Sequence, residues 1–188
     1  MQLLRRAVQP FSQQQWHHTT ILALKRNNQT VIIGDGQVSL GPTIVKTNAT
    51  KIKSLTGGIF CGFAGSVADA FTLLEGLEQV MNKYPKQTLK SCISYAKEWR
   101  TGKQLRHLEA TLIVIDKDLI VELDGSGNVL EIEDVIGVGS GGLYAECAAK
   151  ALLRHSEMGA EEIARAAMKI AADKCIYTSH EWVIQKVE

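Results

Sequence analysis

The sequence predicts an α+β protein in which two antiparallel sheets pack face to face between outer layers of helices, a four-layer αββα sandwich. Segments suited to strands and to helices come in blocks: strands, two helices, strands, two helices and a final strand. Turn signals join successive strands, which favours antiparallel pairing. Helices that come in pairs cannot each connect two parallel strands, so an alternating βαβ order is disfavoured.

The first half of the chain predicts four strands and then two helices. β-forming residues gather in four short runs separated by polar or glycine turns, at residues 20–25, 30–34, 51–55 and 59–63. Ser66 and Asp69, three residues apart, are typical of a helix N-terminus. Apolar residues at helical spacing, Phe71 among them, extend this helix to about Met81, and a second helix fits residues 89–100.

The second half repeats this order and adds a last strand. Four strand-like runs are expected at residues 110–115, 119–123, 129–132 and 135–138. Helical patterns follow at residues 143–154 and 160–173, and the last strand is expected at residues 182–187. No linker composition divides the chain, so residues 19–188 are predicted to form a single domain.

Composition excludes several classes of protein. The chain has 188 residues and a net charge of +1, which does not favour an electrostatic nucleic-acid binder. Its apolar runs are far shorter than a membrane span. The four cysteines show no zinc-site spacing and mostly sit in apolar stretches, so we expect buried free thiols rather than a secreted disulfide scaffold.

The first 18 residues differ from the rest of the chain. No acidic residue occurs before Asp35, whereas Arg5 and Arg6 lie between apolar pairs. An Arg-bearing, acid-free start is typical of a mitochondrial transit peptide, and a ragged N-terminus is an equally weighted alternative. Residues 1–18 are therefore predicted to be a leader that is removed on maturation. His17 and His18 offer two metal ligands without a third and are assigned to this leader.

A glycine-rich stretch at residues 137–142 matches the G-x-G-x-x-G pattern of dinucleotide-binding sites. Glu157 lies at the expected distance, but it falls between two helices instead of after a second parallel strand, so dinucleotide binding is disfavoured. Val138 stands where a serine-hydrolase elbow needs its first glycine. The preferred interpretation is a tight strand-to-helix turn, with Ser140 kept as a candidate site residue.

Thr19 directly follows the predicted leader, so a single cleavage would make it the N-terminal residue. A hydroxyl needs a base to become a nucleophile, and an α-amine is a base with a free pKa of about 8. One N-terminal threonine supplies both groups. Asp35 ends the second predicted strand and Lys51 begins the third. Taken singly, each is more often a turn residue or a solvated charge than a catalytic group.

Several blocks of residues, in order, carry a resemblance to a known family. They are TTIL at 19–22, GDGQVSLG at 34–41, GFAG at 62–65, ADAFTL at 68–73, WRT at 99–101, LRHLEA at 105–110 and GSGG at 139–142. Together they resemble the HslV (ClpQ) peptidases, the threonine-protease relatives of proteasome β subunits. The resemblance extends from Thr19 to about Thr178 and implies the N-terminal nucleophile hydrolase fold, itself an αββα sandwich.

The resemblance implies a role for five residues. Thr19 matches the nucleophile, while Asp35 and Lys51 match its charged partners. Gly62 matches a glycine whose backbone N–H faces the developing oxyanion, and Ser140 matches a serine near the α-amine. The implied reaction is attack by Thr19 Oγ on a peptide carbonyl, formation of an acyl-enzyme ester, and hydrolysis of that ester by water.

The family resemblance also implies a monovalent cation, usually sodium, held by backbone carbonyls. The matching positions are Ala172, Cys175 and Thr178. Ala172 stands where family members commonly have glycine, and a left-handed backbone there would penalise alanine. The alternative is an ordinary helix C-terminus with Cys175 packed as an apolar group.

The resemblance further implies an assembly and a location. Family members form two stacked six-membered rings and depend on the ring ATPase HslU (ClpY), an AAA+ protein that unfolds protein substrates. This chain has no P-loop, so ATP would be used by the partner. The leader favours the mitochondrial matrix, with the bacterial cytoplasm as the alternative. A catalytically inactive subunit with an assembly role remains the alternative function.

Overall fold

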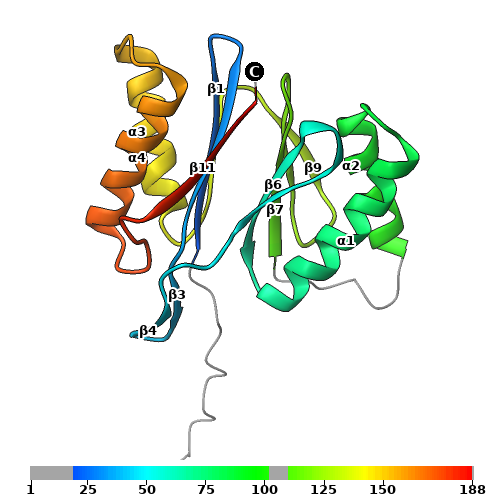
Figure 1. Cartoon of the computed structure of the whole chain (residues 1–188), viewed down its shortest axis with the longest axis horizontal. Helices are drawn as coiled ribbons and strands as arrows, with labels where there is room; N and C mark the ends of the chain where they lie inside the picture. The colour runs from blue at the N-terminus through cyan, green and yellow to red at the C-terminus, as the bar shows by residue number, and fades with distance from the viewer. Residues whose placement is uncertain (1–18, 102–109, 188) are drawn as a thin grey trace, which may run out of the picture.

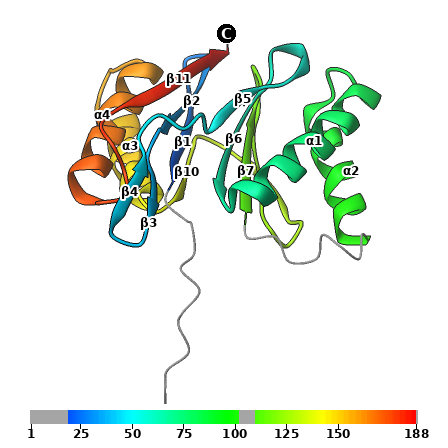
Figure 2. The ribbon, with the colours of Figure 1, turned by 60° about the horizontal axis from the view of Figure 1, so that its bottom comes forward.

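The computed structural model describes residues 19–101 and 110–187 and confirms the predicted four-layer sandwich. In Figure 1 the two sheets stand between a pair of helices on either side, and Figure 2 shows the same layers from another direction. The predicted leader at residues 1–18, and most of the block at 105–110, lie outside the described residues.

The first sheet has the strand order β10-β1-β2-β11, and all its neighbouring pairs are antiparallel. Its strands are β1 (Thr20–Arg26), β2 (Gln29–Asp35), β10 (Val135–Gly139) and β11 (Trp182–Val187). Asn27 and Asn28 turn β1 into β2 with φ of 51° and 60°, a backbone that asparagine tolerates in tight hairpins. The register pairs Ile21 with Gly34, so the start of β1 lies beside the end of β2.

The second sheet has the order β5-β6-β7-β8-β9 and is also antiparallel throughout. Its strands are β5 (Ile52–Ser54), β6 (Phe60–Gly65), β7 (Ala110–Ile115), β8 (Ile120–Leu123) and β9 (Val129–Ile132). A short 3-10 helix, η1 (Thr56–Gly58), joins β5 to β6. Each strand was expected within one or two residues of its observed bounds.

Two helix pairs cover the outer faces of the sheets. The helices are α1 (Val67–Lys83), α2 (Thr88–Thr101), α3 (Gly142–His155) and α4 (Ala160–Lys174). The pair α1 and α2 lies on the second sheet, and the pair α3 and α4 lies on the first (Figure 1). The Ser66 side chain caps α1 by accepting the N–H of Asp69 at 3.4 Å, as the sequence predicted.

Buried apolar side chains form three layers, which explains why the strands are apolar on both faces. Along β1 the side chains alternate, so that Ile21 and Ala23 face the other sheet while Leu22 and Leu24 face α3 and α4. The layer between the sheets is rich in isoleucine: Ile21, Ile32, Ile52, Ile113, Ile115, Ile120 and Ile136. Trp99 of α2 is only 1% exposed and belongs to the third layer, between the second sheet and the helices α1 and α2.

The secondary structure and packing differ from the sequence-based expectation at the hairpin of residues 38–46 and at Phe71. A separate hairpin, β3 (Val38–Leu40) and β4 (Thr43–Lys46), was not predicted; β4 is exposed along its length and therefore shows no alternation. Phe71 was expected on the buried face of α1 but is 45% exposed, and Leu73 is buried in its place. The ring of Phe71 lies 6.1 Å from that of Phe63, at the edge of the sandwich.

The cysteines are free thiols, as expected. Cys61, Cys92 and Cys175 are buried and Cys147 is exposed. Burial raises the pKa of Cys92 to about 12, so this thiol stays protonated. Within residues 19–101 and 110–187, no helix has the length and apolar character needed to span a membrane.

We predict that Gly76→Ala destabilises the fold although alanine favours helices by about 1 kcal/mol. A Cβ at Gly76 in α1 would lie 2.6 Å from the ring of Tyr95 in α2, and Tyr95 is only 4% exposed. Overpacking of this kind costs about 1–3 kcal/mol. Thermal denaturation should show a lower Tm. Gly159→Ala is the control, because its Cβ would meet only a Glu162 carboxylate oxygen at 3.6 Å; equal Tm values would contradict the packing argument.

Candidate active site

Three residues that the sequence singled out meet at one edge of the sandwich because of the strand register. Thr19 directly precedes β1, Asp35 is the last residue of β2, and Lys51 directly precedes β5. The antiparallel pairing of β1 with β2 brings the first two together. The Phe63 N–H of β6 donates to the carbonyl of Lys51 at 3.1 Å, which fixes the third residue at the start of β5.

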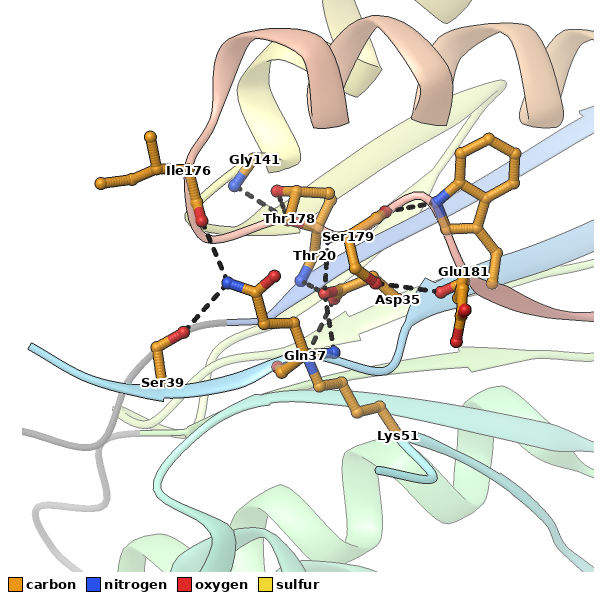
Figure 3. Close-up of polar contacts among 11 residues, drawn as sticks. Thr20, Asp35, Gln37, Ser39, Lys51, Gly141, Ile176, Thr178, Ser179 and Glu181 are labelled. Carbon is orange, nitrogen blue, oxygen red and sulfur yellow. Dashed lines mark hydrogen bonds and ion pairs between the residues drawn. The ribbon is translucent and has the colours of Figure 1, made fainter. Parts of the chain in front are cut away.

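Asp35 is the centre of this arrangement (Figure 3). Its Oδ1 accepts from Lys51 Nζ and from the Thr20 backbone N–H, both at 2.8 Å. Its Oδ2 accepts the backbone N–H of Gln37 at 3.0 Å and that of Ser179 at 3.3 Å. The carboxylate therefore receives donors from four separate segments of the chain.

The Asp35–Lys51 ion pair is buried, with side-chain exposures of 0% and 3%. Burial lowers the pKa of Lys51 from its usual 10.5, while the charge of Asp35 and their hydrogen bond act in the opposite direction. Lys51 Nζ also donates to the backbone carbonyl of Gln37. The ammonium is thus held away from water by one carboxylate and one carbonyl, beside the start of β1.

Thr19 lies at a cavity of about 510 Å³. Lys51 and Lys53 line this cavity together with Phe63, Gly65 and Phe71, so its wall is partly cationic and partly aromatic. Phe71 lies in the wall of this cavity instead of in the core, which accounts for its exposure.

The carbonyl of Thr19 is fixed by the glycine-rich turn. The Ser140 N–H donates to Thr19 O at 2.8 Å, so the structure brings Ser140 to the predicted nucleophile. Gly139, with φ of 84°, has no room for a side chain, because a Cβ there would lie 1.9 Å from Thr19 O. β10 runs antiparallel to β1, which leaves no parallel-strand platform for a dinucleotide. The stretch is the strand-to-helix turn that the sequence favoured.

The structure places Gly62 differently from the role implied by the family resemblance. Gly62 lies inside β6, in register with Ile52 on one side and Ile113 on the other. Backbone N–H groups alternate along a strand. Because the Phe63 N–H points to β5, that of Gly62 points into the sheet toward β7.

Gly65, at the end of β6, is the glycine that lines the cavity. Because N–H groups alternate along a strand, the Gly65 N–H points in the same direction as that of Phe63. It lies beyond the first residue of β5. Gly65 therefore replaces Gly62 as the candidate oxyanion donor. Gly65 could have been found from its position at the end of a strand, but a sequence motif does not show where a strand ends.

Thr20 anchors the first strand through its hydroxyl. Thr20 Oγ1 accepts the Gly141 N–H at 3.0 Å and lies 2.7 Å from Thr178 Oγ1 (Figure 3). Gly141 is required here, since a Cβ would lie 2.3 Å from Thr178 Oγ1. The start of β1 is consequently joined to α3 and to the segment 175–181, which we call the post-α4 loop. Sequence reasoning did not assign a role to Thr20.

The three residues implied to hold a cation lie at the end of α4 and in the post-α4 loop. Ala172 is in the last turn of α4 and has a helical backbone, so the expected penalty for alanine does not arise. The Cys175 carbonyl accepts the Thr178 N–H at 3.0 Å and keeps a second lone pair. Carbonyl oxygens at the negative end of a helix dipole are suited to a cation.

The sequence is similar to those of known proteins. The sequence model of the family described as proteasome subunit matches residues 17–187. The ATP-dependent protease subunit HslV of Paramagnetospirillum magneticum is 52% identical over 174 residues, which are 92% of this chain and 96% of that protein. The same subunit from Caulobacter sp. is 51% identical and covers 92% of this chain and 95% of its own length.

Solved structures show the same likeness. The crystal structure of eukaryotic HslV from Trypanosoma brucei superposes with a TM-score of 0.85 at 40% identity, covering 90% of this chain and 99% of that one. Thiobacillus denitrificans BPH in complex with epoxomicin superposes with a TM-score of 0.72 at 17% identity, covering 90% and 98%. At that identity the second likeness concerns the fold alone.

We predict that Lys51→Met lowers the free energy of unfolding by about 3 kcal/mol, because it leaves the buried Asp35 carboxylate without its counter-charge. Urea denaturation of the variant and of the parent chain measures the difference. Lys150→Met is the control, since the Lys150–Glu146 pair is partly exposed and should contribute little to stability. Similar losses in the two variants would show that the buried pair has no special weight.

Proposed function

The chain belongs to the proteasome subunit family, and we propose that Thr19 is the nucleophile with which it hydrolyses peptide bonds. Relatives named HslV share about half of its residues over nine-tenths of its length, and the chain is accordingly a threonine-type protease subunit of the HslV class. The observation that carries the assignment of Thr19 is the buried Asp35–Lys51 pair at the wall of the Thr19 cavity.

In the proposed reaction Thr19 supplies both the nucleophile and the base. After removal of residues 1–18, the neutral α-amine takes the proton from Thr19 Oγ as the oxygen attacks the substrate carbonyl. The tetrahedral intermediate collapses, the peptide C–N bond breaks, and the proton passes to the departing amine. Water then attacks the ester, assisted by the same amine, and releases the acyl product and free Thr19.

The charged pair sets the proton affinities. An ammonium close to the amine and the hydroxyl lowers the pKa of both, which keeps the amine neutral near pH 7 and eases deprotonation of the oxygen. Asp35 holds Lys51 in place and, through the Thr20 N–H, holds the start of β1. The Ser140 N–H holds the Thr19 carbonyl, and in the proposed reaction the Ser140 hydroxyl takes part in proton transfer at the amine.

The developing oxyanion needs a hydrogen-bond donor that already points toward it. In other enzymes such a donor lowers the activation free energy by about 2.7–4 kcal/mol. Gly65 is our candidate for this donor, because it lines the cavity with Thr19. The N–H of Gly62, the donor that the family resemblance implied, points into the sheet toward β7.

A sodium ion held by the carbonyls of Ala172, Cys175 and Thr178 is part of the proposal. When bound, it would supply structural charge at the end of α4 and take no part in the chemistry. Its site would stabilise the post-α4 loop, which donates the Ser179 N–H to Asp35.

The assembly and location are also proposals. The relatives' name, ATP-dependent protease subunit, supports a separate HslU-type AAA+ ATPase that delivers unfolded proteins, and we propose a double hexameric ring of this chain. The acid-free first 18 residues support the mitochondrial matrix. The bacterial sources of HslV relatives support the bacterial cytoplasm as the alternative.

Thr19→Ala tests the proposed nucleophile. The variant keeps the backbone contacts of Thr19 O and the Thr20 N–H but has no hydroxyl, so we expect peptide cleavage to fall to background while assembly persists. Peptidase assays with the ring ATPase, paired with size-exclusion chromatography, measure both. Thr43→Ala, on the exposed strand β4, is the matched control and should retain activity. Wild-type turnover in Thr19→Ala, or an active protein whose intact mass includes residues 1–18, would refute the assignment.

We predict a bell-shaped pH profile of kcat/KM. The acid limb reports the Thr19 amine, whose pKa should fall below its free value of about 8 because of the neighbouring ammonium. The alkaline limb reports loss of the Lys51 proton and should lie below 10.5, because burial lowers that pKa. Activity is therefore lost on both sides, and a rate that stays constant through pH 10.5 would exclude a role for ionised Lys51.

A further inference from the structure

Gln37 is a buried polar residue whose side chain has no role in the proposed chemistry. It lies between β2 and β3 and is 4% exposed. A buried amide that lacks partners is costly, so its contacts indicate what it is fixed to. All of them lie within the site (Figure 3).

The backbone of Gln37 contacts both members of the charged pair. Its N–H donates to Asp35 Oδ2 at 3.0 Å. Its carbonyl accepts from Lys51 Nζ. A shift of this residue would therefore change the position of the ammonium and the carboxylate together.

The side chain of Gln37 fixes that backbone. Nε2 donates to Ser39 Oγ at 3.0 Å and to the Ile176 carbonyl, in the post-α4 loop, at 3.0 Å. A carbonyl accepts only, so the orientation of the amide is determined by Ile176. The preceding residue, Gly36, is held through its backbone alone: its N–H donates to the Glu181 carbonyl at 3.3 Å and its carbonyl accepts the Ala49 N–H at 2.9 Å.

We propose that Gln37 is a positioning residue, whose side-chain amide fixes the backbone carbonyl that receives Lys51 Nζ and thereby sets where the ammonium faces Thr19. This rests on the proposed function, in which ionised Lys51 acts on Thr19. The amide also joins the post-α4 loop to the charged pair, so that loop takes part in holding the site.

Gln37→Leu tests this role, since leucine fills a similar volume without an amide. Misplacing a catalytic group by a fraction of an ångström is expected to lower kcat about tenfold or more, with KM within about threefold of the parent. The alkaline limb of kcat/KM should move to lower pH, because an ammonium that loses an acceptor gives up its proton more easily. The assay uses the matured full chain in its native assembly.

Two buried serines provide a second variant, Ser39→Ala, and its matched control, Ser91→Ala. Ser39→Ala removes one acceptor of the Gln37 amide, whereas Ser91→Ala removes a hydroxyl that donates to the Gln87 carbonyl at 3.0 Å in α2. Ser39 and Ser91 are 1% and 0% exposed, so the two changes should lower Tm similarly. Only Ser39→Ala should lower kcat and shift the alkaline limb, by less than Gln37→Leu does.

The outcomes separate this inference from the proposed function. If Gln37→Leu keeps the parent kcat and alkaline limb while Lys51→Met loses turnover, Gln37 is not a positioning residue and the function stands. If Ser91→Ala loses as much kcat as Ser39→Ala, the effect is general destabilisation and the inference is overturned. Full turnover in Lys51→Met would overturn the proposed function itself.

Discussion

The burial of one ion pair constrains the rest of the site. Removing a carboxylate and an ammonium from water costs several kcal/mol per ion, and this cost is offset only if every acceptor and donor is matched. Asp35 meets the requirement with Lys51 and with three backbone N–H groups, of Thr20, Gln37 and Ser179. The start of β1, the end of β2, the start of β5 and the post-α4 loop must therefore converge on one point.

That convergence determines which small residues the chain needs nearby. Gly139 lets the turn after β10 approach the Thr19 carbonyl, and Gly141 lets α3 begin against the hydroxyls of Thr20 and Thr178. At both positions the backbone closely approaches other backbone or a buried side chain, and a methyl group there would displace the start of β1. The glycine-rich stretch that resembles a nucleotide-binding motif is thus explained by packing around Thr19.

The sequence was sufficient for the layers and for the residues that carry charge, and insufficient for the residues whose proposed roles depend on a backbone group. Hairpin turns and paired helices have local signals, so the order of β1, β2, α1 and α2 was predictable. The hairpin of β3 and β4 was missed because an exposed strand shows no alternation. Gly65 and Gln37 were missed because the direction of an N–H or a carbonyl depends on register, which a motif does not encode. Phe71 was misplaced because helical periodicity alone does not distinguish the core from a cavity wall.

The contacts that hold Thr19 also bear on the proposed removal of residues 1–18. In the full chain the nitrogen of Thr19 is part of a peptide bond to His18, and an amide nitrogen is not a base. The anchors of this residue are its own carbonyl, bound by the Ser140 N–H, and the next N–H, bound by Asp35. Neither involves the bond to be cleaved. The proposed removal of residues 1–18 would therefore change the proton affinity of the Thr19 nitrogen and leave these two contacts unchanged.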